Sequence, residues 1–206
     1  MKFKAVLAAV SFGALTTASA QAAVVSPTLG FDLSLAGNTN VPVFTLVNTS
    51  DPGNQLVQFT FTIGDVTRHF DFVSPLSNPA GGTATLNSPD TGNNGVRSDL
   101  ISINFTGFDA GESVTFESDI DVDPASNVVQ DFRNVFFNNG SALNSVATAL
   151  FSTGDSVSLT LPDNQQVFRF SASNTVSTVP LPMALPLFAA GLAGLGIAAC
   201  RRRKDA

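Results

Sequence analysis

His69 is the single histidine of the chain and the first residue to consider for catalysis. It stands in a segment where polar and apolar residues alternate, so Thr67, His69 and Asp71 are expected on one face of a strand. Asp71 could orient the imidazole toward a serine, as in a Ser-His-Asp hydrolase. The chain has, however, neither a G-x-S-x-G elbow nor a glycine-rich oxyanion loop. The pattern therefore favours a surface histidine beside a carboxylate over a catalytic base, and we expect no enzyme activity.

Four acidic residues at alternate positions form a second candidate site. They are Glu117, Asp119, Asp121 and Asp123. On a strand they would share one face at spacings of about 6.5–7 Å. The pattern favours a solvated face or edge, where charges prevent pairing with other chains, and a structural Ca²⁺ completed by loop carbonyls is the alternative. An EF-hand is excluded because Pro124 and Gln130 stand where Gly and Glu are needed.

Zinc binding lacks ligands, because His69 and Cys200 are the only histidine and cysteine of the chain. We therefore predict no metal and no cofactor. The same count excludes an intramolecular disulfide bond. Stability must then come from packing and from backbone hydrogen bonds.

Period-two alternation of apolar residues indicates strands with one buried face. Turn sequences such as Asp51-Pro-Gly-Asn and Asp109-Ala-Gly-Glu separate them. The pattern predicts an all-β fold, an antiparallel β-sandwich of jelly-roll type with about 8–10 strands. Only Leu143–Phe151 also admits a helical interpretation. The predicted strands are 29–35, 43–47, 57–63, 66–73, 101–105, 114–122, 128–137, 146–151, 157–161 and 167–170.

The charges are distributed unevenly along the chain. Residues 21–200 contain 4 of the 10 basic and 15 of the 16 acidic residues, so this segment carries 4 − 15 = −11. A segment this acidic repels phosphate backbones, which makes nucleic acid an unsuitable partner. The chain has 18 Phe but no Trp or Tyr. Phe fills cores, and without Trp or Tyr a lectin-type stacking platform is disfavoured; hydrogen-bonded or cation-bridged glycan contacts stay open.

The first 22 residues have the layout of a secretory signal peptide. Lys2 and Lys4 precede an apolar run from Ala5 to Leu15, and small residues follow. Cleavage is expected after Ala20 or Ala22. A short membrane anchor is the alternative, but the run is too short to span a bilayer. We assign residues 23–171 to the β-sandwich and 172–178 to a linker.

The chain closes with a segment, residues 179–206, that has three parts. Val179-Pro180-Leu181-Pro182 comes first, and residues 180–200 form a run of 21 uncharged residues. At about 1.5 Å per residue, a helix of this length spans roughly 30 Å, the hydrocarbon core of a bilayer. Arg201, Arg202, Arg203 and Lys204 follow and are expected to stay on the cytoplasmic side.

This tripartite end resembles the PEP-CTERM family of sorting signals in its Val-Pro-Leu-Pro-Ala (VPLPA) variant. The resemblance covers residues 179–204, and Met183 departs from the usual Ala. It implies cleavage near the motif by an exosortase-type membrane protease, in a Gram-negative producer of exopolysaccharide. The signal residues would be Val179, Pro180, Leu181, Pro182, Arg201, Arg202 and Arg203.

We therefore expect an exported, non-enzymatic surface or extracellular-matrix protein associated with exopolysaccharide. It would begin as an inner-membrane-anchored precursor, held by its C-terminal helix, and end at the cell surface or outside the cell. Two alternatives are open. One is a membrane protein that keeps its tail, and the other is a secreted hydrolase acting on polysaccharide or ester substrates.

Overall fold

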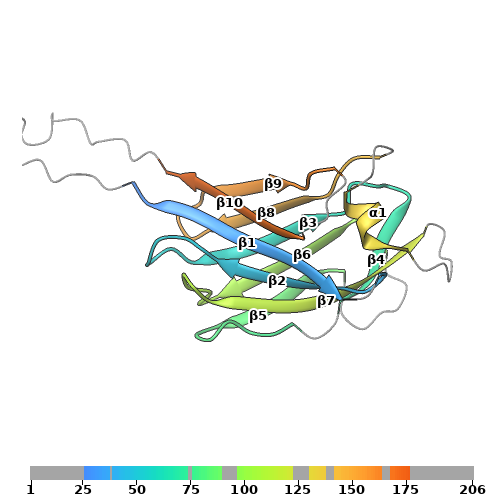
Figure 1. Ribbon diagram of the computed structural model, residues 1–206. Helices are drawn as coiled ribbons and strands as arrows, with labels where there is room; N and C mark the ends of the chain where they lie inside the picture. Colours follow the sequence, from blue (N-terminus) through green and yellow to red (C-terminus); the bar gives the residue numbers. More distant parts are fainter. Residues whose placement is uncertain are drawn as a thin grey trace, which may run out of the picture. The chain divides into compact units, whose positions relative to one another are not determined.

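Two antiparallel sheets of five strands each lie face to face in the computed structural model (Figure 1). The structure describes residues 26–37, 39–73, 76–89, 97–122, 130–137, 142–163 and 168–176. All of them belong to one unit, Ser26–Val179. The prediction of an all-β antiparallel sandwich is thereby confirmed.

The first sheet has the strand order β10-β1-β2-β7-β4. Its strands are β1 (Thr28–Gly37), β2 (Pro42–Asn48), β4 (Arg68–Val73), β7 (Ser113–Val122) and β10 (Arg169–Thr175). The second sheet has the order β5-β6-β3-β8-β9. Its strands are β3 (Leu56–Thr62), β5 (Thr83–Ser88), β6 (Leu100–Thr106), β8 (Val146–Phe151) and β9 (Ser156–Thr160).

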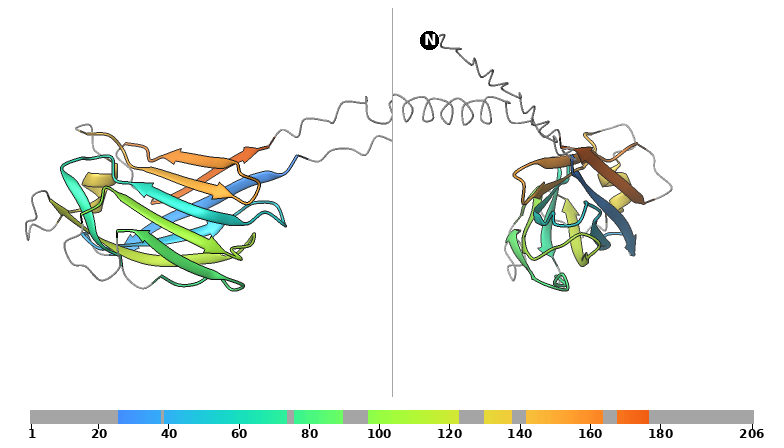
Figure 2. Two further views of the ribbon diagram at one scale, coloured as in Figure 1. Left: turned by 180° about the vertical axis from the view of Figure 1, so that it is seen from behind. Right: turned by 90° about the vertical axis from the view of Figure 1, so that its left-hand side faces the viewer.

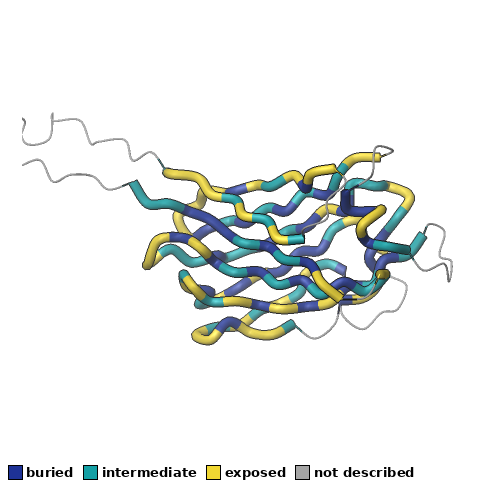
Figure 3. Tube along the Cα trace, viewed as in Figure 1, coloured by how far each residue is buried: buried dark blue, intermediate teal, exposed yellow. Residues whose placement is uncertain are grey.

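The alternation read from the sequence sets which face of each strand is buried. Along β2 and β8, buried residues alternate strictly with half-buried ones, and Figure 3 shows the same alternation in both sheets. The inward residues form one hydrophobic core between the sheets. Twelve of its buried members are phenylalanines, namely Phe31, Phe44, Phe59, Phe61, Phe70, Phe105, Phe108, Phe116, Phe132, Phe136, Phe137 and Phe151.

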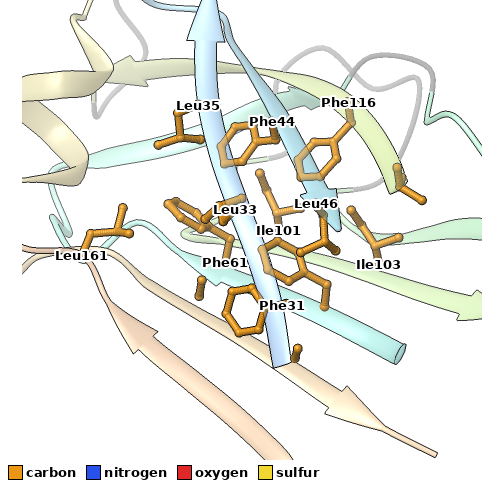
Figure 4. Packing of buried hydrophobic residues seen from close by; sticks show 14 of the residues in the cluster. Phe31, Leu33, Leu35, Phe44, Leu46, Phe61, Ile101, Ile103, Phe116 and Leu161 are labelled. Carbon is orange, nitrogen blue, oxygen red and sulfur yellow. The ribbon is translucent and has the colours of Figure 1, made fainter. Parts of the chain in front are cut away.

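Phe44 lies beside Phe116 in this core (Figure 4). Its ring is stacked on Phe116 of the same sheet, with centroids 4.7 Å apart and planes at 9°. It also meets Phe61 of the second sheet edge-to-face at 5.2 Å and lies 5.8 Å from Phe136. Offset-stacked and edge-to-face pairs are the favourable arrangements of aromatic rings. Phe44 therefore joins the two sheets and the helix described next.

The segment 128–137, which we predicted to be a strand, is instead helical where the structure describes it. Helix α1 spans Phe132–Phe136, and Asp131 is its N-cap. The carboxylate of Asp131 accepts hydrogen bonds from the backbone N–H of Arg133 at 3.0 Å and from its Nε at 2.7 Å. Buried Phe132, Val135 and Phe136 have the i, i+3, i+4 spacing of a helix face. The alternation rule failed here because this apolar group is only one turn long.

One further strand differs from the prediction, and one alternative is excluded. The strand β5 was not predicted, because this edge strand carries only Ala84 and Leu86 on its apolar phase. It follows Gly82, where a Cβ would overlap the carbonyl oxygen of Thr106, so glycine lets the chain approach β6. The helical alternative for Leu143–Phe151 is wrong, since 146–151 form β8.

The predicted linker, residues 172–178, begins inside a strand. The last strand, β10, continues to Thr175 because it pairs with β1 over its whole length, from Ser34↔Arg169 to Thr28↔Thr175. The polar composition of residues 172–178 had suggested a linker. On an edge strand, however, polar side chains face the solvent without ending the strand. The folded unit therefore ends nearer to Val179 than expected.

We expect Phe44→Ala to lower the free energy of unfolding by about 3–5 kcal/mol, because it opens a cavity among three other rings. The melting temperature should fall by roughly 10 °C. The control is Phe72→Ala, since Phe72 is 42% exposed and its truncation should change stability by about 0.5 kcal/mol or less. Circular dichroism is the suitable measurement, as the chain has no Trp or Tyr. Equal losses for the two variants would contradict the assignment.

The cap of α1 gives a pH-dependent prediction. The hydrogen bond from the Arg133 side chain lowers the pKa of the Asp131 carboxyl. Its stabilisation is therefore complete above the unfolded-state pKa of about 4 and is lost as the pH falls through the lower folded-state pKa. Asp131→Ala should cost about 1 kcal/mol at pH 7. Asp131→Asn keeps a capping oxygen without the charge, so its stability difference from the parent protein, measured by urea unfolding, should vanish at low pH; a difference that persists there would contradict the assignment.

Candidate functional site

A groove of about 330 Å³ lies on the outer face of the first sheet. It crosses the three neighbouring strands β10, β1 and β2, and we call it the sheet groove. Register places its polar side chains side by side, with Asp32 opposite Ser171 and Ser34 opposite both Arg169 and Thr45. The residues lining the sheet groove are Asp32, Leu33, Ser34, Thr45, Val47, Arg169, Phe170 and Ser171.

The two charged residues of the sheet groove are available to a ligand. Within the described parts of the chain, neither the Asp32 carboxylate nor the Arg169 guanidinium forms an ion pair. Arg169 is exposed and Asp32 is half-buried. A guanidinium offers a planar fork of donors that matches a carboxylate, and the Asp32 carboxylate accepts hydrogen bonds from hydroxyl groups. The sheet groove thus suits a ligand that carries both a carboxylate and hydroxyls.

The acidic row lies on β7, which has a neighbour on each side and is not an edge strand. Glu117 is exposed, and Asp119 and Asp121 are half-buried on the outer face. Oδ1 of Asp119 accepts hydrogen bonds from Nδ2 of Asn40 at 3.2 Å and from the N–H of Ile120 at 2.9 Å. Among the described residues no group of three or more His, Cys, Asp or Glu could hold a metal ion. Asp123 lies outside the described residues.

His69 is buried, with 2% of its surface exposed, and the expected surface position is wrong. Register places Phe70 opposite the core residue Ile120, so His69 lies on the outer face of the sheet and is buried there. A β-bulge between Phe70 and Phe72 changes the side of the later residues only, so that Phe72 is exposed while Val73 is buried. His69 pairs in register with Asp121 of β7. A general base must reach its substrate, and this burial keeps the imidazole from a dissolved one.

The predicted processing residues lie outside the described residues. They are Ala20, Ala22, Val179, Pro180, Leu181, Pro182, Arg201, Arg202 and Arg203. In the part of the chain that the structure describes, no helix is long and apolar enough to cross a membrane.

Comparison of the chain with family models, with curated proteins and with solved structures gives no match in any of the three.

Sequence reasoning did not find the sheet groove. One signal was present, since Arg169 is one of four basic residues between positions 21 and 200 and falls on the polar phase of a predicted strand. Local sequence patterns do not show which strand lies beside the one that carries Arg169. Asp32 and Arg169 are brought together only by the pairing of β1 with β10, across almost the whole domain.

We expect Arg169→Ala to weaken binding of a soluble polyuronate such as alginate roughly 10- to 100-fold, the loss typical of a charge-assisted hydrogen bond. The control is Arg97→Ala, which removes the same charge from an exposed position that does not line the sheet groove. Affinity electrophoresis at about 0.15 M salt would measure both, because charges more than about 8 Å apart are then screened and the general repulsion between the acidic domain and a polyanion is reduced. If the two variants lose binding equally, net charge and not the sheet groove is responsible.

Proposed function

We propose that this chain is an exported, non-enzymatic surface or matrix protein that is sorted through its C-terminal segment and associates with exopolysaccharide. An exosortase-type membrane protease would recognise the motif at Val179–Pro182 and cut near it. The precursor is held in the inner membrane by the helix that follows the motif, and the mature domain is surface-attached or released.

The observation that carries the proposal is the order of features along the chain. A leader with small residues at Ala20 and Ala22 comes first, and the Val-Pro-Leu-Pro motif, the uncharged run and the arginine cluster come last. The structure adds one supporting fact, because β10 ends at Thr175, just before Val179. A cut near the motif would therefore release a domain whose strands are all intact.

The chemistry of the domain agrees with a binding role. The sheet groove presents a cation, an anion and hydroxyls without a catalytic partner. A glycosidase needs two carboxyl groups across a cleft, whereas the sheet groove contains a single one, Asp32. We further propose a jelly-roll type of sandwich, since six of the nine connections between consecutive described strands cross from one sheet to the other.

The test is deletion of residues 179–206 in the producing cell. We expect the truncated protein to be secreted past the surface and lost to the medium, because the sorting handle is gone. Cys200→Ala, a change within the same segment but outside the motif and the arginine cluster, is the matched control and should leave sorting unchanged.

Intact-mass analysis of the surface form completes the test. The mature chain should begin after Ala20 or Ala22 and end close to Pro180. A truncated protein that still reaches the surface and stays there, or a surface form that keeps all of its tail, would contradict the proposal.

A further inference from the structure

The two sheets differ completely in charge. The strands of the first sheet contain every charged residue that lies in a strand, among them Asp32, Arg68, Glu117 and Arg169. The five strands of the second sheet contain no Asp, Glu, Lys or Arg. Residues 21–200 carry −11 overall. The absence of charge on these five strands therefore distinguishes the outer face of the second sheet from that of the first.

The outer face of the second sheet, which we call the neutral face, is covered by hydroxyl and amide groups. Figure 2, left, shows this sheet toward the viewer, from β9 and β8 to β5. Register aligns Ser88, Ser102, Thr60, Thr148 and Ser158 in one row across all five strands. The outward polar residues of the neutral face that are exposed or half-buried are Gln58, Thr60, Thr62, Thr83, Thr85, Asn104, Thr106, Thr148, Ser156, Ser158 and Thr160, whereas Ser102 of the same row is buried.

Hydrogen bonds between neighbouring strands hold several of these side chains in place. The hydroxyls of Thr83 and Thr106 are 2.8 Å apart, and those of Thr148 and Ser158 are 2.9 Å apart. Nε2 of Gln58 donates to Oδ1 of Asn104 at 3.0 Å. Each of these groups keeps further donor or acceptor capacity on its solvent side. The neutral face is thus ordered before a ligand arrives, which reduces the entropy lost on binding.

The chemistry of the neutral face decides between classes of partner. Without a Lys or Arg it cannot neutralise phosphates, so it does not suit nucleic acid. A second copy of the chain would need an apolar interface centre, but the apolar side chains here are only the half-buried Val57, Leu100, Val146 and Leu150. A neutral polysaccharide presents hydroxyls that both donate and accept hydrogen bonds, and no charge on the neutral face is desolvated when it binds.

We propose that the neutral face binds an uncharged polysaccharide chain laid across the strands. This inference deepens the proposed association with exopolysaccharide and rests on it, but it assigns the neutral polymer to a different face from the sheet groove. Single hydroxyl contacts are weak in water, so binding depends on many contacts made at once along one chain. Long polymers are therefore held and short oligosaccharides are not. Because charges take no part, binding does not change with salt.

The experiment is affinity electrophoresis of segment 24–178, which contains the whole hydrophobic core, in gels that hold dextran as the neutral probe. We expect the protein to be retarded, and equally so at about 0.05 M and about 0.5 M NaCl, where screening of charges differs strongly. Isomaltotriose should not compete with the polymer. Thr60→Glu with Ser158→Glu, both on the neutral face, should reduce the retardation at least fivefold.

The matched control is Thr175→Glu with Ser113→Glu, the same two changes at exposed positions of the first sheet. It should leave dextran binding within twofold of the parent protein. Thr60→Val with Thr148→Val removes hydroxyls but keeps the β-branched shape, so it should weaken binding while the melting temperature is retained. This pair keeps the test valid if the Glu variants do not fold.

Three results would overturn the inference. The first is that dextran does not retard the parent protein, although the parent protein still binds alginate and Arg169→Ala does not. The proposed function would then stand without the neutral face. Another is dextran binding that falls with salt. The third is an equal loss in the neutral-face variant and in its control. Failure to bind either polymer would count against both proposals.

Discussion

Packing of phenylalanine rings between the two sheets is the interaction on which the rest of the domain depends. The chain has one cysteine, so no internal disulfide can hold the sheets together. Phe44 touches rings from its own sheet, from the opposite sheet and from α1. Because the rings fill the space between the layers, each strand must direct its apolar phase inward. The outward residues take no part in this packing, so the outer faces of the two sheets can differ in charge, and they do.

This freedom produces two surfaces with distinct chemistry. On the first sheet, pairing of β1 with β10 places Asp32 and Arg169 around one groove. On the second sheet, five strands without a charge carry aligned hydroxyls and amides. In the two proposals, the domain binds charged polymers through the first sheet and uncharged polymers through the second. Both sheets pack on one shared core, so the arrangement of side chains on one outer face does not depend on the residues of the other.

Alternation in the sequence predicted β1, β3 and β6 because their large apolar residues repeat every second position. It failed where the local pattern was too short or weak. Phe132, Val135 and Phe136 fit a helix over a single turn, and β5 has only Ala84 and Leu86 to bury. The bulge between Phe70 and Phe72 moved Phe72 to the side opposite the expected one. The candidate site was beyond local patterns altogether, since its residues meet through pairing of distant strands.

The pairing of β1 with β10 determines when the domain can complete its fold. These are the first and last strands of the described domain, joined from Ser34↔Arg169 to Thr28↔Thr175, and Val176 donates a backbone hydrogen bond to Pro27 at 3.0 Å. A chain exported from its N-terminus cannot close this sheet until the final strand has emerged. Long-range closure of this kind is slow. In the export that we propose, the chain would therefore pass through a channel unfolded and complete its fold only after β10 has emerged.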